Sequence, residues 1–280
     1  MPANEQQAEA WNGPESLHFV EHADRYDLQL EPFTQALLAR ALPQAHEVVL
    51  DVGCGSGATT LAAAAKAERA TGLDLSRPLV ELAMRRARAA AVGNADFVIA
   101  DAQTHDFTAE TFDLLISQFG LMFFDDPVLA LTNIRGAMRP GGRAVFVSWQ
   151  ELPANEWLML IGEAVGRYVE LPEFGGQARG PGMFSLCNVD EIATLLCAAG
   201  FEQVECESWT PKILIGGGGS LDGSIKFLLH TGMARGLLSL VDPTAQAEVV
   251  RTVSADLGAR YEEGVGTRVG AAAWVVAART

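Results

Sequence analysis

The sequence predicts an α/β fold whose core is a doubly wound, mostly parallel sheet with helices on both faces. Two observations carry this prediction. Between residues 47 and 149, short runs rich in β-branched residues alternate with longer segments of helical character, which is typical of βαβ units. A turn with three glycines follows the first of these runs, at the position where open parallel sheets bind their ligands.

Five strands and three helices are expected in this region. Ser76 and Pro78 mark the start of the second helix, because serine favours the N-cap position and proline the first helical turn. The sequence "RPGG" at 139–142 ends the third helix. In chain order we expect strand 47–52, helix 59–69, strand 70–75, helix 77–91, strand 96–101, strand 112–117, helix 125–138 and strand 143–149.

The pattern becomes less regular after residue 149. Residues 155–168 and 189–199 are predicted to be helical, and 171–181 form a loop rich in glycine and proline. Alternating residues at 201–209 and an apolar run at 271–278 predict two further strands. The sequence "IGGGGSLDGS" at 215–224 is interpreted as a mobile loop within a lid.

The length of 280 residues suits one domain with an inserted cap. We expect an N-terminal helical lid segment at 1–45 and a ligand-binding core at 46–150. Residues 151–280 complete the core with the strands at 201–209 and 271–278, and they carry cap insertions at about 153–185 and 210–268.

Charge and cysteine usage exclude several classes of function. The net charge of −15 and a pI near 4.7 disfavour nucleic acid as a partner, and the basic run at 85–90 is interpreted as a solvated helix face. No apolar run is long enough for a membrane span, and no signal peptide is visible at the N-terminus. The four cysteines lack CxxC spacing, which argues against a zinc site and favours a cytoplasmic location.

The glycine-rich turn "DVGCGSGA" at 51–58 is the strongest local signal. Gly53, Gly55 and Gly57 would let the chain turn sharply and let a ligand approach where a Cβ would collide. The same residues satisfy the pattern GxGxx(G/A) of dinucleotide-binding proteins, so NAD has to be considered as the ligand.

Three consecutive strands end in an aspartate. Asp51 stands beside the turn, where a carboxylate disfavours a pyrophosphate and suits a ligand with ammonium and sulfonium groups. Asp74 can accept hydrogen bonds from both hydroxyls of a ribose, and Asp101 can accept one from an adenine amino group. Each aspartate could instead cap a turn or a helix, or lie on a surface loop, but three in succession favour a binding site.

Five segments in order, "VVLDVGCGSG", "ATGLDLS", "FVIADAQ", "FDLLISQFGLMFF" and "MRPGGRAVFVSW", resemble the motifs of class I S-adenosylmethionine (SAM)-dependent methyltransferases. The N-terminal "WNGPESLHFVEHADRYDLQLEPFTQALL" is similar to the leading helices of small-molecule enzymes of this class, which close over the cofactor. The resemblance implies a Rossmann-like, seven-stranded sheet with a helical cap, SAM as cofactor and S-adenosylhomocysteine as product. It implies a cofactor site made of Trp11, Asp51, Gly53, Gly55, Asp74, Leu75, Asp101, Ala102 and Gln118.

Within that resemblance, Asp51, Gly53 and Gly55 would hold the methionine part of SAM, and Gln118 would lie beside the sulfonium. The fourth strand departs from the family pattern for amine substrates, in which an asparagine or aspartate ends the strand. Here the strand ends in Ser117-Gln118-Phe119, so the pattern of an adenine N-methyltransferase is absent.

Methyl transfer from a sulfonium is an in-line displacement in which the enzyme mainly aligns the acceptor. If the acceptor must lose a proton, the candidate bases are His18, His22, Tyr26, His230 and Glu151. His22 and Tyr26 are preferred as catalytic residues because they lie on the expected lid helix, although each could be a structural residue. Many reactions of this class need no base.

The predicted substrate is a small organic molecule, either a metabolite or a short peptide. Apolar side chains on the cap suit an enclosed pocket, although they could equally form the cap's own core: Trp157, Phe174, Met183, Phe184, Phe227 and Met233. Neither nucleic acid nor a membrane is expected as a partner, and a homodimer is left open. Two alternatives remain: an NAD-dependent oxidoreductase, for which a Tyr-x-x-x-Lys set is missing, and a SAM-binding protein without catalysis.

Overall fold

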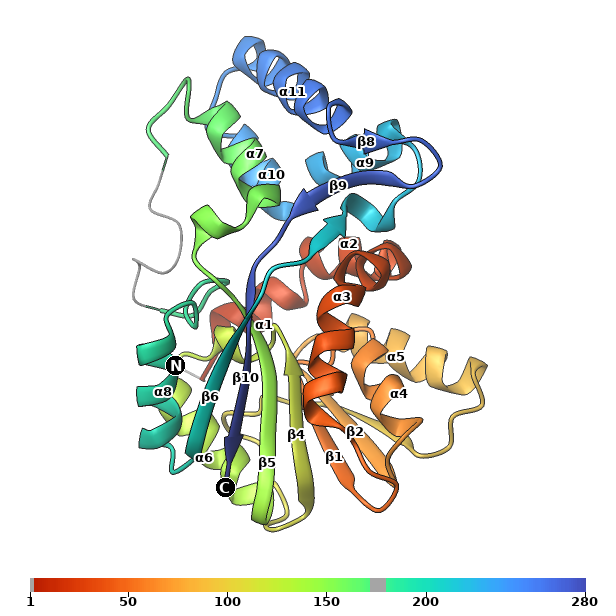
Figure 1. Ribbon diagram of the computed structural model, residues 1–280, viewed down its shortest axis with the longest axis vertical. Helices are drawn as coiled ribbons and strands as arrows, with labels where there is room; N and C mark the ends of the chain where they lie inside the picture. Colours follow the sequence, from red (N-terminus) through yellow and green to blue (C-terminus); the bar gives the residue numbers. More distant parts are fainter. Residues whose placement is uncertain (1–2, 172–179) are drawn as a thin grey trace.

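The computed structural model describes residues 3–171 and 180–280 (Figure 1). Its centre is a seven-stranded sheet in the order β3-β2-β1-β4-β5-β10-β6. The neighbouring pairs from β3 to β5 are parallel, whereas β10 is antiparallel to both β5 and β6. The strands are β1 (Val48–Val52), β2 (Arg69–Asp74), β3 (Ala95–Ile99), β4 (Phe112–Gln118), β5 (Met138–Trp149), β6 (Glu202–Trp209) and β10 (Ala273–Arg279).

Helices cover both faces of this sheet, as the sequence predicts (Figure 1). One face carries α3 (Ala23–Ala41), α4 (Ala58–Ala64) and α5 (Arg77–Ala89), and the other carries α6 (Pro127–Ala137) and α8 (Val189–Ala198). Strand order reverses between β1 and β4, so the ligand crevice of a doubly wound sheet is expected outside the carboxyl ends of these two strands.

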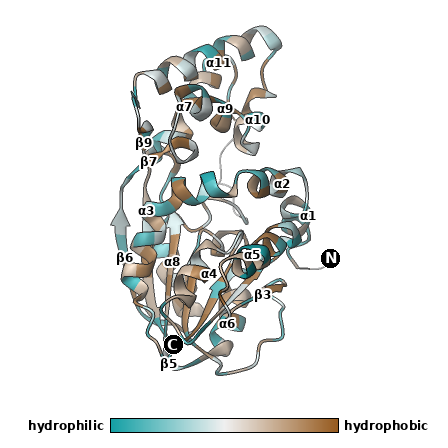
Figure 2. Cartoon of the chain, turned by 90° about the vertical axis from the view of Figure 1, so that its right-hand side faces the viewer, coloured by the Kyte–Doolittle hydropathy of each residue, from teal (hydrophilic) through white to brown (hydrophobic). Residues whose placement is uncertain are grey.

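Each helix buries an apolar stripe against the sheet. In α5 the buried residues are Leu79, Val80, Ala83 and Ala87, spaced at helical intervals, while the outer surface is hydrophilic (Figure 2). Ser76 occupies the N-cap position of α5 as predicted, but its hydroxyl makes no capping hydrogen bond.

Two predicted boundaries differ from the structure by five residues. The helix expected at 59–69 ends at Ala64, because the side chain of Asn94 donates to the carbonyl groups of Ala64, Ala67 and Glu68 and holds the chain in a turn. The fifth strand begins at Met138 instead of Arg143, since residues 138–142 join it across an irregularity in the pairing with β4.

A second group of elements lies above the carboxyl ends of the strands (Figure 1). The three-stranded sheet β7-β9-β8 packs with the helices of this upper unit. Along the chain, β7 follows β6, and β9 precedes β10. Its elements are α7 (Glu156–Val165), β7 (Lys212–Leu214), α9 (Leu221–Leu229), α10 (Gly232–Leu238), α11 (Pro243–Gly258), β8 (Tyr261–Glu262) and β9 (Gly266–Gly270). The N-terminal helices α1 (Glu5–Trp11) and α2 (Pro14–Glu21) precede α3.

The segment 215–224, expected to be a mobile loop, is held on α3. The N–H of Gly216 donates to the side-chain oxygen of Gln29 at 2.7 Å, and Arg25 donates to the carbonyl groups of Gly216 and Gly223. Short 3₁₀ turns occur here at Ile215–Gly217 and elsewhere at Leu121–Phe123 and Leu152–Ala154. The loop expected at 171–181 lies almost entirely outside the described residues.

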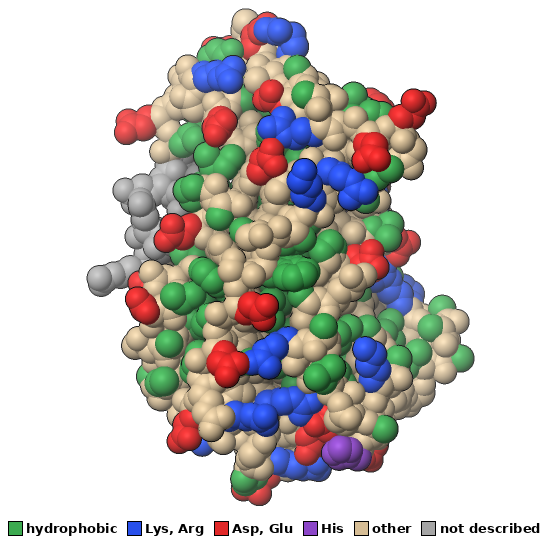
Figure 3. Space-filling model, in the orientation of Figure 1, with side chains coloured by type: hydrophobic (Ala, Val, Ile, Leu, Met, Phe, Trp, Pro, Cys, Tyr) green, Lys and Arg blue, Asp and Glu red, His purple; other side chains and the backbone are tan. Residues whose placement is uncertain are grey.

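Acidic and basic side chains are interspersed on the face shown in Figure 3, and apolar side chains gather at the waist between the sheet and the upper unit. Among the described residues, no helix has both the length and the apolar character needed to cross a membrane.

Candidate functional site

A cavity of about 320 Å³ lies at the carboxyl ends of β1, β2, β3 and β4, below the upper unit. Its lower part is formed by the glycine-rich turn after β1 and by the residues that end β2 and β3. Its upper part is formed by aromatic and methionine side chains from α2, α3, α7, α9 and α10 and from the segment after β4. The position is the one expected from the reversal of strand order.

The glycines of the turn have different roles. Gly53 has a φ of 72°, and a Cβ added to it would lie 2.6 Å from the Cα of Gly120, so the loops after β1 and β4 touch here. Gly55 has a φ of 51°, and an added Cβ would meet nothing within 4 Å. Since Gly55 also lines the cavity, its open side is space available to a ligand.

Asp74 lies in the cavity wall as predicted. Its Oδ2 accepts a hydrogen bond of 2.8 Å from the N–H of Gly55, and its Oδ1 accepts one of 2.8 Å from the N–H of Ser76. Burial raises the pKa of the Asp74 carboxyl, and the hydrogen bonds from Ser76 and Gly55 oppose this rise. Leu75, the next residue, also lines the cavity.

Asp51 does not line the cavity, and a direct contact with a cofactor is therefore not supported. Its side chain is fully buried behind the turn, where Oδ2 accepts hydrogen bonds of 2.6 Å from the hydroxyls of Thr59 and Thr60. Burial raises the pKa of Asp51 to about 6, against the effect of these two hydrogen bonds. Side chains alternate along β1, and that of Asp51 points toward α4. Asp51 therefore contacts Thr59, and Thr59 in turn lines the cavity.

Asp101 and Ala102 line the cavity, but the carboxylate of Asp101 already has a partner. The side-chain amide of Asn4 lies 2.9 Å from both of its oxygens, and the N–H of Gln103 donates to Oδ1. Asn4 is fully buried and also forms two hydrogen bonds of 2.6 Å with the backbone N–H and the carboxylate of Asp125. Asn4 was not anticipated, because nothing in the sequence near it indicates a contact with residue 101.

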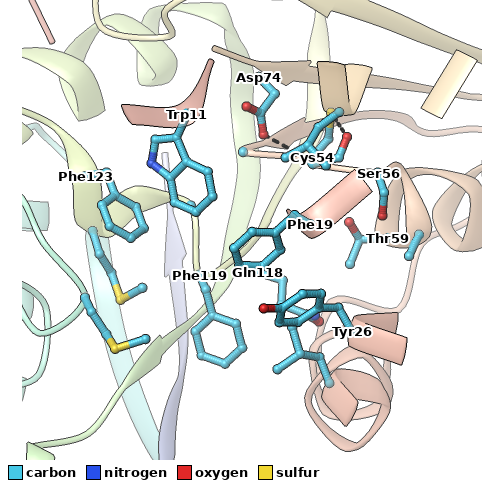
Figure 4. A pocket seen from close by; sticks show the side chains of 18 of the residues that line it. Trp11, Phe19, Tyr26, Cys54, Ser56, Thr59, Asp74, Gln118, Phe119 and Phe123 are labelled. Atoms are coloured by element: carbon cyan, nitrogen blue, oxygen red, sulfur yellow. Dashed lines mark hydrogen bonds between the residues drawn. The ribbon is translucent and has the colours of Figure 1, made fainter. Parts of the chain in front are cut away.

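Trp11 lines the same end of the cavity, near Asp74 (Figure 4). Its ring lies 5.5 Å from those of Phe19 and Phe123, in tilted and edge-on arrangements. Asn12 fixes the adjacent turn, because it donates to the carbonyl of Leu75 and accepts from the N–H of Arg77. The N-terminal helices therefore cross the cavity at the ends of β2 and β4.

Gln118 lines the cavity at the end of β4, next to the turn. Its Oε1 accepts a hydrogen bond of 2.8 Å from the hydroxyl of Thr34 on α3.

Of the five candidate bases, only Tyr26 lines the cavity. His22, the other preferred candidate, lies outside the lining at the junction of α2 and α3, with its ring 4.6 Å from that of His18. His230 and Glu151 are exposed, and the Nδ1 of His230 is 2.6 Å from the carbonyl oxygen of Lys226. The assignment of His22 as a catalytic residue is therefore not supported by its position.

The aromatic walls are stacked in pairs. Phe119 stacks on Trp149 with ring centroids 3.9 Å apart, and Phe19 stacks on Tyr26 at 4.1 Å. Of the cap residues that the sequence singled out, Trp157, Met183, Phe227 and Met233 line the cavity, and Phe184 is buried away from it. Phe174 lies outside the described residues.

Asp27 of α3 is a cavity residue that sequence reasoning missed. It forms an ion pair of 2.8 Å with Arg86 and lies 3.4 Å from the hydroxyl of Ser56 in the glycine-rich turn. Burial raises the pKa of Asp27, and Arg86 opposes this rise. Arg86 also pairs with Asp24, so this member of the basic run 85–90 ties α5 to α3 and is not simply a solvated charge.

Comparison with known proteins agrees with this geometry. A family profile described as a methyltransferase domain matches residues 50–146. The chain is 33% identical over 137 residues to the aklanonic acid methyltransferase DauC of Streptomyces sp. (strain C5), an alignment that spans 46% of this chain and 62% of that protein. It is 25% identical over 179 residues to the demethylmenaquinone methyltransferase of Clavibacter sepedonicus, spanning 61% of this chain and 72% of that protein.

The fold resembles that of phosphoethanolamine N-methyltransferase 2 of Haemonchus contortus, solved in complex with S-adenosyl-L-methionine. The TM-score is 0.54 at 18% identity, with 88% of this chain and 51% of that chain covered. The chain spans less than two thirds of the length of the aklanonic acid methyltransferase. Residues 50–146 are thus similar to a methyltransferase domain, and the seven-stranded sheet has the fold of the methyltransferase structure that it resembles.

Proposed function

We propose that the protein transfers the methyl group of SAM to a small organic molecule. One observation carries the proposal: a single cavity joins the glycine-rich turn and Asp74 to an apolar chamber with aromatic walls. The lower part has the polar groups that a nucleoside and an amino acid need, and the upper part has the character of a pocket for a small apolar acceptor.

The residues of the lower part fit the cofactor. The open side of Gly55 leaves room for the ligand where a Cβ would intrude. Each oxygen of Asp74 accepts one backbone hydrogen bond and keeps a lone pair for a ribose hydroxyl. We assign the methionine end to Gly53, Gly55 and Ser56 with Asp27 beside them, and the adenine end to Asp101 and Ala102.

Bound SAM would supply an electrophilic methyl group on a sulfonium. The chain's own residues would then orient the acceptor, exclude water and, where needed, take a proton. Gln118 and Phe119 lie where β4 ends, beside the turn after β1, so they are placed to contact the acceptor. Tyr26 is the remaining candidate base, and no histidine is found among the described residues that line the cavity.

We further propose the division of the chain into a lid segment at 1–45, a cofactor-binding core at 46–150 and a remainder with cap insertions at about 153–185 and 210–268. The proposal is supported by the crossing of α1 and α2 over the lower cavity and by the cap side chains in its upper wall. An enclosed chamber would protect the reaction from water.

Two alternatives give different results in simple experiments. An NAD-dependent oxidoreductase would bind NAD at the same turn, whereas the proposed enzyme binds SAM and S-adenosylhomocysteine. A SAM-binding protein without catalysis would bind both SAM and S-adenosylhomocysteine but form no methylated product. Incubation with radiolabelled SAM and a whole extract of the host, which is afterwards separated into small molecules and nucleic acids, therefore tests the proposal. Labelled low-molecular-weight product supports it, and label found only in RNA or DNA contradicts it.

We also propose a cytoplasmic location, supported by the four cysteines, which the structure shows as free thiols. Nucleic acid is not proposed as a substrate, since the net charge is −15. A homodimer is left to measurement of the mass in solution.

A further inference from the structure

We propose that the acceptor presents a hydroxyl oxygen, ionised as a phenolate or enolate, to the side-chain amide of Gln118. Thr34 is the positioning residue that turns this amide toward the acceptor. This inference rests on the methyl transfer proposed above and names the class of its acceptor. Two features support it: the hydrogen bond between Thr34 and Gln118, which leaves an N–H donor for the cavity, and the flat aromatic walls beside it.

The hydrogen bond fixes the direction of the amide. The hydroxyl of Thr34 is 2.8 Å from Oε1 of Gln118 and 3.4 Å from the carbonyl oxygen of Leu30. A hydroxyl has one proton, and the shorter contact is the stronger bond, so Thr34 donates to Oε1. The NH₂ group of Gln118 is then the end left for the cavity, and it has no acceptor in the part of the chain that the structure describes.

The walls around Gln118 suit a planar molecule. Phe119 has a φ of 62°, a conformation that residues with a Cβ rarely adopt, and its ring is stacked on Trp149 with an interplanar angle of 9°. Phe19 and Tyr26 form a second stack with an interplanar angle of 17°. In Figure 4, Gln118 lies among Phe19, Phe119 and Tyr26. A flat apolar ring held between these faces would bring its polar substituent to Gln118.

The N–H donor that Gln118 presents to the cavity favours an oxygen over an amine. The carboxylates of the described lining are Asp27, Asp74 and Asp101, and the proposed function assigns all three to the cofactor. A protonated amine and a hydroxyl must each lose a proton before they react, but an N–H donor can stabilise only the anion that the hydroxyl becomes. An ionised oxygen would instead meet the N–H of Gln118, and a hydrogen bond to the charged form lowers the pKa of the acceptor hydroxyl.

The acceptor releases its hydroxyl proton to water and binds as the anion, so the chemical step balances without a further reactant. An electron pair of the ionised oxygen, or of a ring carbon conjugated with it, forms a bond to the methyl carbon. The carbon–sulfur bond breaks, and its electron pair stays on sulfur as the neutral thioether of S-adenosylhomocysteine. If the ring carbon is methylated, its proton moves to the oxygen and restores the hydroxyl.

Two probes of the same shape test the proposal: 4-nitrophenol carries a hydroxyl, and 4-nitroaniline carries an amino group in its place. Protein saturated with S-adenosylhomocysteine is titrated with each probe, and the pKa of bound 4-nitrophenol is read from its visible absorbance. The wild type should prefer 4-nitrophenol by about tenfold or more, because a hydrogen bond to a charged group is the stronger kind. The pKa of bound 4-nitrophenol should lie below its value in free solution.

The variants separate positioning from general packing. Gln118→Leu and Thr34→Val should remove the preference and raise the pKa of the bound probe, whereas Thr34→Ser keeps the hydroxyl and both effects. Gln118→Glu replaces the donor with an acceptor and should make the protein prefer 4-nitroaniline. This variant tests the inference if Thr34→Val does not fold. Thr132→Val is the matched control, because Thr132 is an exposed threonine of α6 that donates to the carbonyl of Val128.

Three results would overturn the inference: equal affinity of the wild type for the two probes, binding of neither probe, or a folded Thr34→Val variant that keeps both the preference and the pKa. Calorimetry with S-adenosylhomocysteine alone separates this failure from that of the proposed function. A wild type that binds S-adenosylhomocysteine without preferring 4-nitrophenol contradicts only the acceptor assignment. A wild type that does not bind S-adenosylhomocysteine contradicts the proposed function itself.

Discussion

The carboxylate of Asp74 accepts the backbone N–H of Gly55 at 2.8 Å and thereby joins the end of β2 to the turn after β1. The turn is also pressed against the loop after β4, because Gly53 and Gly120 leave no room for a Cβ between them. The cavity floor is thus a rigid structure made of three strand ends. A ligand that uses Asp74 would find its position fixed before it binds, which lowers the entropy that binding costs.

Replacement of Asp74 by alanine should weaken SAM binding by about 1.5–3 kcal/mol, because hydrogen bonds to a charged carboxylate are lost. Stability should fall by a smaller amount, on the order of 1 kcal/mol, since the N–H groups of Gly55 and Ser76 lose their acceptor. Calorimetric titration and thermal unfolding measure the two effects. Asp106→Ala, at an exposed residue, is the control. Unchanged affinity with a collapsed melting temperature would mean that Asp74 is only structural.

Alanine substitutions at three glycines should separate close packing from ligand space. Gly53→Ala should destabilise the fold by several kcal/mol, because the new Cβ would lie 2.6 Å from backbone. Gly55→Ala should cost only about 1–2 kcal/mol of stability for its positive φ but should abolish measurable SAM binding. Gly136→Ala, on α6 with open space around it, should stabilise by about 0.5–1 kcal/mol. Chemical denaturation gives all three values, and a Gly55→Ala protein with normal affinity would refute the assignment of ligand space.

The stability contributed by Asp51 should depend on pH. Its pKa is raised to about 6 in the folded state, so its protonated form is favoured by folding. The stability that this protonated carboxyl contributes is fully present when the pH is below the pKa of Asp51 in the unfolded chain. It is lost as the pH rises through about 6, the pKa in the folded state. Asp51→Asn removes the ionisation. The difference in unfolding free energy should therefore shift in favour of the variant by up to about 3 kcal/mol between pH 4 and pH 8. Denaturation curves of both proteins at the two pH values measure this difference. The same difference at pH 4 and at pH 8 would contradict the prediction.

Asn4→Ala should loosen the N-terminal segment. The change removes the amide that lies against Asp101 and the oxygen that accepts from the N–H of Asp125. We expect SAM to dissociate about tenfold faster, which corresponds to about 1.4 kcal/mol, and proteases to cleave near the N-terminus more readily. Stopped-flow fluorescence measures the dissociation rate. Gln7→Ala on α1 is the control, and identical rates for Asn4→Ala and wild type would show that the segment does not hold the ligand.

The sheet could be predicted from the sequence because its signals are local. Each of the first five strands is a short apolar run, and the glycine turn fixes where the first of them ends. The same locality placed Asp74, Asp101 and Gln118 at strand ends, and all three line the cavity. The side of the sheet toward which a side chain points at the end of a strand is harder to predict. Asp51 stands at the end of β1 like the others, yet its side chain turns toward Thr59 and Thr60.

The residues that the sequence could not identify depend on contacts between distant segments. Asn4 meets Asp101 across 97 positions, and Thr34 meets Gln118 across 84. Asp27 of α3 lines the cavity, and its partner there is Arg86 of α5. His22 and Tyr26 lie one helical turn apart in the sequence, but α3 begins between them, so only Tyr26 faces the chamber.

The most direct measurement is a calorimetric titration of the purified protein with SAM, S-adenosylhomocysteine and NAD. A class I methyltransferase with Asp74 on the ribose and Gly55 open to the ligand should bind the first two in a 1:1 complex and show no saturable heat with NAD. Tight binding of NAD, with no heat from SAM or S-adenosylhomocysteine, would contradict it.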